Sequence, residues 1–141
     1  LAHEFEWRCK QAGQLASKMR YIAAPWVHLL RDGAWLRHAA HANQMAARLA
    51  RALKKIKGVE LLMPRQANGV FVELPLPVID ALHARGWHFY TFIGAGGARL
   101  MCSWDTTQED VDDFATDLAE MMANRKNLQS KPAKGQGRKP H

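Results

Sequence analysis

The segment "FIGAGGARLMCSWDTT" at residues 92–107 joins two apolar stretches through a cluster of glycines. The stretches "WHFYTFI" (87–93) and "ARLMCSW" (98–104) are rich in the aromatic and apolar side chains that are typical of strands. The glycines between them favour a tight turn that uses positive φ. We therefore expect two strands joined by a short turn.

The same glycines also invite comparison with a phosphate-binding loop. Such a loop follows a strand and opens a helix, so that the backbone N–H groups and the helix N-terminus point at the anion. Here Gly97 leads into an extended apolar segment, and no Gly-Lys-Ser or Gly-Lys-Thr follows. A nucleotide site is therefore disfavoured.

Working outward from this segment, helical and extended patterns alternate. The pattern predicts an amphipathic helix from Ala34 to a stop at Gly58, because apolar residues recur at intervals of three and four. It then predicts strands at "VELLM" (59–63) and "GVFVELP" (69–75), a helix from Pro77 to Gly86, and a last helix over about 107–123. Thr106 or Thr107 with Glu109 or Asp110 forms a capping-box pattern at its start. This order predicts a small α/β or α+β sheet with helices on one face.

The first 31 residues are predicted to be helical but interrupted. Gly13 should interrupt the helical pattern of residues 4–31 and Pro25 should end or kink a helix, so that two or three short helices are expected. Asp32 with Gly33 marks a turn. The helical pattern starts at Glu4 without a cap, and residue 1 is Leu1 rather than methionine. We expect this chain to lack an N-terminal portion.

The net charge of +7 is concentrated at the C-terminus. Residues 125–141 hold six of the 20 Lys and Arg and no acid, which leaves 14 basic against 13 acidic side chains in residues 1–124. The tail is poor in apolar residues, so we expect it to be disordered. No apolar run approaches the roughly 20 residues of a membrane span, and a signal peptide pattern is missing, so we expect a cytoplasmic protein.

One arginine stands out as a candidate binding residue. Arg99 lies in a predicted strand beside Leu100 and Met101, which we expect to be largely buried. A guanidinium there needs a carboxylate or phosphate partner, which would be either a ligand or an internal acid such as Asp105. The composition leaves both alternatives open.

Other candidate groups carry a weaker signal. Lys18 and Arg20 form a cationic cluster with Lys10 and Ser17, which a solvated helix face would also explain. His38 and His41 could share a helix face, but the sequence offers no third metal ligand, so we expect no metal site. The sequence shows no recognisable Ser-His-Asp or Cys-His pattern of a nucleophilic catalytic site.

Three segments carry a family resemblance: "RCKQAGQLASKMRYIAAPW" (8–26), "AWLRHAAHANQMAARLARAL" (34–53) and "RLMCSWDTTQEDVDDF" (99–114). Over about residues 1–122 the chain resembles the C-terminal part of low-specificity L-threonine aldolases. These are pyridoxal-phosphate enzymes of the aspartate aminotransferase fold type (fold type I), within the β-eliminating lyase group. The resemblance implies that residues 1–33 end the large cofactor-binding domain, that 34–124 form the small C-terminal domain, and that 125–141 are a tail.

The resemblance also implies roles for individual residues. The family binds the substrate α-carboxylate with an arginine in a segment like "RLMCSWD", which corresponds to Arg99. A second arginine of many relatives aligns without gaps to Ser17, with Lys18 adjacent and Arg20 as the alternative, so these are candidate cofactor or substrate contacts. The Schiff-base lysine of the family lies upstream, so no catalytic residue is expected in this chain.

The function implied for the intact protein is retro-aldol cleavage of L-threonine or L-allo-threonine to glycine and acetaldehyde, with pyridoxal 5′-phosphate as cofactor. The resemblance implies a homodimer or homotetramer, and it implies that this chain by itself is inactive. The alternative is a non-catalytic binding module that uses its basic tail on nucleic acid or another acidic surface. The near-neutral charge of residues 1–124 argues against nucleic acid as a partner of the folded part.

Overall fold

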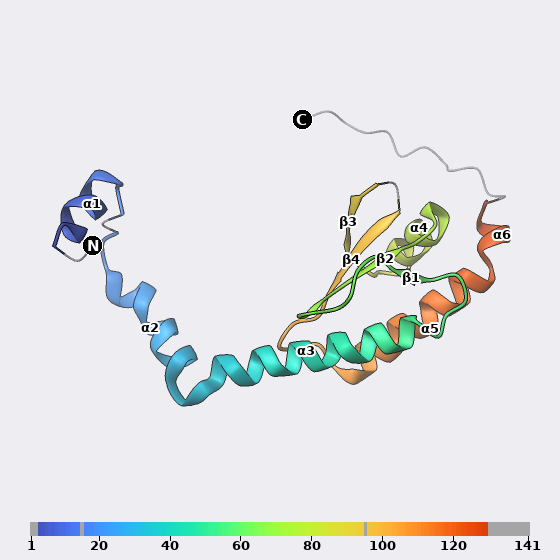
Figure 1. The fold of residues 1–141 in the computed structure, drawn as a ribbon, viewed down its shortest axis with the longest axis horizontal. Coiled ribbons are helices and arrows are strands. Elements are labelled where there is room, and N and C mark those ends of the chain that lie inside the picture. The colour runs from blue at the N-terminus through green and yellow to red at the C-terminus, as the bar shows by residue number, and fades with distance from the viewer. Residues whose placement is uncertain (1–2, 15, 95, 130–141) are drawn as a thin grey trace. The chain divides into compact units, whose positions relative to one another are not determined.

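The computed structural model describes residues 3–14, 16–94 and 96–129. It divides into two compact units, Leu1–Arg37 and His38–His141. The described elements are, in chain order, α1 (Phe5–Gln11), α2 (Met19–Leu30), a 3₁₀ turn (Arg31–Gly33), α3 (Ala34–Leu53), β1 (Glu60–Leu61), β2 (Gly69–Glu73), α4 (Leu76–Ala84), β3 (Tyr90–Ile93), β4 (Gly97–Met101), α5 (Gln108–Ala123) and α6 (Arg125–Gln129) (Figure 1). None of the described helices is long and apolar enough to cross a membrane.

The first unit contains α1 and α2, and neither helix buries a side chain within this chain. Gly13 separates the two helices with a φ of 66°, as expected. The expectation that Pro25 interrupts the chain is wrong in one respect, because α2 continues through Pro25 to Leu30. The proline ring holds φ near helical values and removes only one backbone N–H, so the helix loses one hydrogen bond without ending. Asp32 forms the predicted turn before α3, with a φ of 57°.

The second unit is built on a four-stranded antiparallel sheet with the order β1-β2-β4-β3. The two central strands, β2 and β4, pair over five residues, from Gly69 opposite Met101 to Glu73 opposite Gly97. Side chains alternate between the two faces of a strand. Val70 and Val72 of β2 therefore share a face with the buried residues of β4, and the residues between them lie on the opposite face.

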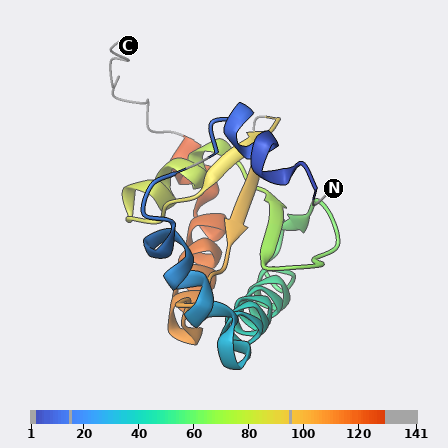
Figure 2. The same ribbon diagram turned by 90° about the vertical axis from the view of Figure 1, so that its left-hand side faces the viewer.

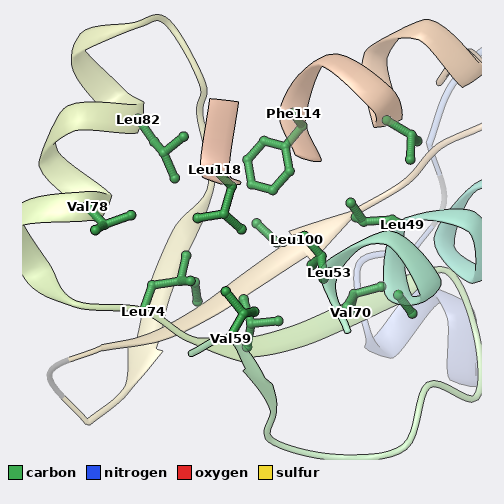
Figure 3. Close-up of a cluster of buried hydrophobic side chains, with 14 of the residues drawn as sticks. Leu49, Leu53, Val59, Val70, Leu74, Val78, Leu82, Leu100, Phe114 and Leu118 are labelled. Atoms are coloured by element: carbon green, nitrogen blue, oxygen red, sulfur yellow. The ribbon is translucent and has the colours of Figure 1, made fainter. Parts of the chain in front are cut away.

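Three helices, α3, α4 and α5, cover one face of this sheet, as the sequence predicts. Figure 3 shows their apolar side chains meeting those of β2 and β4 in one core; labelled residues include Leu49, Leu53, Val78, Leu82, Phe114, Leu118, Val70 and Leu100. Figure 2 shows α3 and α5 side by side, and the ion pair between Arg48 and Asp112 joins them at 2.6 Å. The burial of these large apolar side chains supplies most of the stability of the unit, since each contributes about 1.5–3 kcal/mol.

The glycine cluster between β3 and β4 forms a turn, and a strand follows it rather than a helix. This excludes the phosphate-loop arrangement. Gly94 has a φ of 60°. Gly96 is required for a different reason, because an added Cβ would lie 2.5 Å from the carbonyl oxygen of Leu74. The N–H of Leu74 donates to the Gly96 carbonyl at 2.9 Å, so the turn is bonded to the end of β2 and β4 starts at a fixed place.

Polar contacts fix the position and the start of α5. Asp117 accepts hydrogen bonds from Trp87 Nε1 (2.7 Å) and from Arg85 (2.6 Å), which also pairs with Glu120 at 2.8 Å. The capping box forms between Thr107 and Asp110, one of the combinations that the sequence offered. Hydrogen bonds from Thr107 lower the pKa of the Asp110 carboxyl, which keeps it charged beside the helix N-terminus.

One other expectation needs correction. The tail was expected to be disordered from Arg125, but residues 125–129 form α6, because Leu128 packs against the core and gives this segment buried surface. The rest of that prediction, residues 130–141, lies outside the described residues. The five tryptophans of the chain differ in their surroundings. Trp87 packs on the core, edge-to-face with Phe114 at 5.1 Å. The other four tryptophans are exposed within the described part of the chain: Trp7, Trp26, Trp35 and Trp104. The exposed Trp104 ring also contacts the ring of His38.

Gly96→Ala is expected to destabilise the second unit by about 1–3 kcal/mol, because the new methyl group meets a backbone oxygen that cannot rotate away. Gly69→Ala is the matched control, since the atoms nearest to its added Cβ belong to the side chains of Met101 and Phe71 rather than to the backbone. Denaturant unfolding of both variants checks this. Equal losses in the two variants would contradict the role given to the Leu74 contact.

The stability of the second unit should also fall in acid. Hydrogen bonds from Trp87 and Arg85 lower the pKa of Asp117. Its stabilising effect is therefore complete above the unfolded pKa of about 4, and it is lost as pH falls through the folded value. Asp117→Asn should flatten the decrease of unfolding free energy below about pH 4, whereas Asp80→Asn, an exposed carboxylate on α4, should leave it unchanged. Identical pH profiles for wild type and Asp117→Asn would refute this.

Candidate functional site

Arg99 lies on the face of the sheet that no described helix of the second unit covers. Its neighbours in β4, Ala98 and Leu100, are buried in the core on the other face, whereas Arg99 is half-buried. Met101 was expected to be buried but is 53% exposed, because it follows Arg99 at the period of two and shares its face. The guanidinium is thus presented on a surface that is partly apolar.

Two aromatic residues flank Arg99 across the sheet. Phe71 of β2 and Tyr90 of β3 are its direct cross-strand partners, so all three side chains lie on the same face. The Cζ atom of Arg99 lies 5.5 Å from the centre of the Tyr90 ring, which is a cation–π contact. Tyr90 is 72% exposed. The candidate site is therefore an arginine with aromatic side chains on both neighbouring strands.

The acid named as an internal partner for Arg99 has other contacts. The Ser103 hydroxyl donates to the Asp105 carboxylate, and the Ser103 N–H donates to the Thr106 hydroxyl at 2.8 Å. These bonds fold residues 103–106 into a compact loop after β4. The chemistry of Arg99 remains that of a planar donor group, which suits a carboxylate or a phosphate.

The loop after β4 is attached to α3 and to β2. A His41 ring nitrogen donates to the Thr106 carbonyl at 2.7 Å, and His38 meets Trp104 edge-to-face at 5.5 Å. The side-chain amide of Asn68 donates a hydrogen bond to the backbone carbonyl of Cys102 at 2.8 Å. The backbone N–H of Cys102 donates to the backbone carbonyl of Asn68 at 2.9 Å. His38 and His41 therefore have structural contacts, and the described residues contain no group of three His, Cys, Asp or Glu that could hold a metal.

Three candidate residues of the first unit lie at the start of α2. Ser17, Lys18 and Arg20 are exposed, and Lys18 is the N-cap residue of α2 with a φ of 59°. Arg20 lies 5.1 Å from the Tyr21 ring centre. The structure therefore brings these three residues together at one helix end. They belong to the first unit and Arg99 belongs to the second.

A cavity of about 230 Å³ lies beside the end of β4, with a lining that includes Trp87, Phe89, Cys102 and Asp110. Burial raises the pKa of the Cys102 thiol, so this cysteine stays protonated and is a poor nucleophile. Asp110 is engaged in the capping box. Neither Cys102 nor Asp110 is therefore an activated group in this cavity.

The aromatic partners of Arg99 were not singled out from the sequence. Alternation in "GVFVE" (69–73) places Phe71 opposite the valines, and this signal was available. The pairing of Tyr90 and Phe71 with Arg99 depends on strand order and register, which no local pattern determines.

Comparison with known proteins gives two close curated relatives. The chain is 58% identical over 123 residues to the low-specificity L-threonine aldolase of a Pseudomonas species, which covers 87% of this chain and 36% of the relative. It is 60% identical over 122 residues to the enzyme of that name from Pseudomonas aeruginosa, covering 86% of this chain and 35% of the relative. The chain thus spans about a third of the length of these relatives. No family model matches it.

Solved structures confirm the expected fold class. A Leishmania major threonine aldolase has a TM-score of 0.59 and 28% identity, covering 67% of this chain and 28% of that one. The cystine lyase C-DES, in complex with cysteine persulfide, has a TM-score of 0.52 and 18% identity over 59% of this chain and 24% of its own, which supports the fold alone. A C-DES mutant with glycine linked to its pyridoxal-phosphate cofactor has a TM-score of 0.51.

The order of the elements, the small antiparallel sheet with helices on one face, and the identity of about 60% to two curated enzymes agree with one another. The chain belongs to the low-specificity L-threonine aldolase family, and it corresponds to about a third of the curated members that it matches.

Proposed function

We propose that the chain is the C-terminal part of a pyridoxal-phosphate-dependent threonine aldolase, which cleaves L-threonine or L-allo-threonine to glycine and acetaldehyde. The observation that carries this proposal is Arg99, which is presented at the centre of the uncovered sheet face in a chain so similar to known threonine aldolases. The alternative of a binding module that acts through its basic tail gains no support from the comparisons.

Arg99 binds the α-carboxylate of the amino acid. Its planar fork matches the two carboxylate oxygens, and its place in a strand bonded on both sides limits its movement. By holding the carboxylate, Arg99 fixes the orientation of the Cα–Cβ bond that breaks, which is a positioning role. Pyridoxal phosphate supplies the electron sink for that cleavage when it is bound.

The described residues fit the substrate better than they fit the reactive end of the cofactor. Their lysines lie in helices, at helix ends and in turns, and none lies on a strand: Lys10, Lys18, Lys54, Lys55, Lys57 and Lys126. The family resemblance implies that the Schiff-base lysine lies in the upstream part of the enzyme, and on that ground we propose that residues 1–141 are inactive alone. Lys18, Ser17 and Arg20, at the N-terminus of α2, are suited to an anion and are proposed as contacts to the cofactor phosphate or the substrate.

We also propose that residues 1–33 belong to the large domain and residues 34–124 form the small one. Among the described residues of the first unit, eleven large apolar side chains are exposed, including Trp7, Ile22 and Trp26. Apolar surface of this extent marks a contact with further protein. The upstream part of the enzyme and a second subunit of a homodimer or homotetramer are the surfaces that would cover it.

Arg99→Ala in the full-length enzyme should lower kcat/KM for threonine on the order of 10- to 100-fold, because a charge-assisted bidentate contact to the substrate is lost. Arg99→Lys should recover only part of it, because an ammonium group cannot form the planar fork. Arg48→Lys is the matched control, since Arg48 binds Asp112 between two helices. Steady-state kinetics with cofactor absorbance as the loading check test this, and unchanged kcat/KM in Arg99→Ala would refute the assignment.

The isolated chain should form no stoichiometric Schiff base with pyridoxal phosphate. Purified residues 1–141 mixed with the cofactor are expected to show only the weak absorbance that exposed lysines give. Reduction with borohydride followed by mass spectrometry gives the stoichiometry and the site. A single modified lysine at full occupancy would contradict the view that the Schiff-base residue lies upstream.

A further inference from the structure

The guanidinium of Arg99 has a directional contact that the proposed function does not use. Tyr90 is the cross-strand partner of Arg99, and the Arg99 Cζ atom lies 5.5 Å from the centre of its ring. The pair lies at the β3–β4 edge of the uncovered face. Phe71 occupies the corresponding position in β2 on the other side of β4.

An arginine that recognises a carboxylate must be held in place without losing its donors. The arginine side chain carries about 2 kcal/mol of rotamer entropy, so an unrestrained guanidinium spends little time in one orientation. A ring face attracts the cation through its quadrupole and leaves the N–H groups in the guanidinium plane available.

The exposure of Tyr90 is consistent with a ring that holds the Arg99 guanidinium in place. It is 72% exposed in this chain, so packing against the described core does not explain a large aromatic side chain at this position. Its neighbour Thr91 pairs with Ala98, whose side chain is on the core face, so the alternation of β3 aims Tyr90 toward Arg99. The tyrosine is thus placed by the sheet register rather than by the core.

We propose that Tyr90 is a positioning residue for substrate binding: its ring holds the Arg99 guanidinium over the sheet so that the N–H fork faces the substrate carboxylate. This inference rests on the proposed role of Arg99. It assigns the effect to the ring face, and the tyrosine hydroxyl has no part in it. Tyr90 touches the arginine and acts through it.

The test uses the full-length enzyme with Tyr90→Leu, which removes the ring, and Tyr90→Phe, which keeps it. Tyr90→Leu should raise KM for threonine and the dissociation constant of glycine about three- to thirty-fold, the range of a cation–π contact from exposed to desolvated. Tyr90→Phe should stay within about two-fold of wild type. Cofactor absorbance should be the same in all variants, because the ring acts on the substrate carboxylate only.

A double-mutant cycle separates this inference from the proposed function. In an Arg99→Gln background, Tyr90→Leu should cause no further loss, because the ring no longer has a cation to hold. Loss in Arg99→Ala without loss in Tyr90→Leu would overturn the inference and leave the function of Arg99 intact. No loss in either variant would overturn both.

Two further outcomes also decide against the proposal. Equal loss in Tyr90→Phe and Tyr90→Leu would assign the effect to the hydroxyl, and a persistent effect of Tyr90→Leu in the Arg99→Gln background would assign it to another contact. Thermal unfolding of each variant checks the fold. If Tyr90→Leu lowers the Tm, the cycle is repeated with Tyr90→Met, which keeps apolar bulk without a ring, and the same criteria apply.

Discussion

The pairing of β2 with β4 is the interaction on which the second unit depends. Five consecutive residue pairs, from Gly69 with Met101 to Glu73 with Gly97, fix which side chains face the helices. Because the period of a strand is two, the register that buries Val70, Val72 and Leu100 also puts Arg99 on the opposite face. One constraint thus produces both the core and the face that carries Arg99, and neither could change alone.

The core, rather than the ion pairs, stabilises this arrangement. The contacts of Arg48 with Asp112 and of Arg85 with Asp117 and Glu120 are at least partly exposed, and such solvent-screened pairs add little net stability. These ion pairs determine how α5 lies against α3 and α4. The packing of α5 is stabilised by the burial of its apolar side chains, such as Phe114 and Leu118.

Local sequence patterns predicted most of the elements but not their arrangement. The helix from Ala34, the strand at Gly69–Glu73 and the capping box were predictable because periodicity and capping are local properties. The strand expected at residues 59–63 is only Glu60–Leu61, and the exposure of Met101 was missed, since both depend on which strands become neighbours. Arg99 was singled out as an arginine in an apolar strand, whereas Tyr90 at its side required the strand order β1-β2-β4-β3.

The exposed apolar side chains of α1 and α2 have a thermodynamic consequence. A helix of 12 residues that buries nothing, as α2 does in this chain, is marginal in water by itself. Its helical state is therefore linked to whatever covers Tyr21, Ile22 and Trp26, and a covering surface stabilises it by mass action. Under the proposed contact with further protein, the free energy of folding of α1 and α2 would be a property of the assembly, so that mutations in the covering surface would change the stability of these helices without touching their sequence.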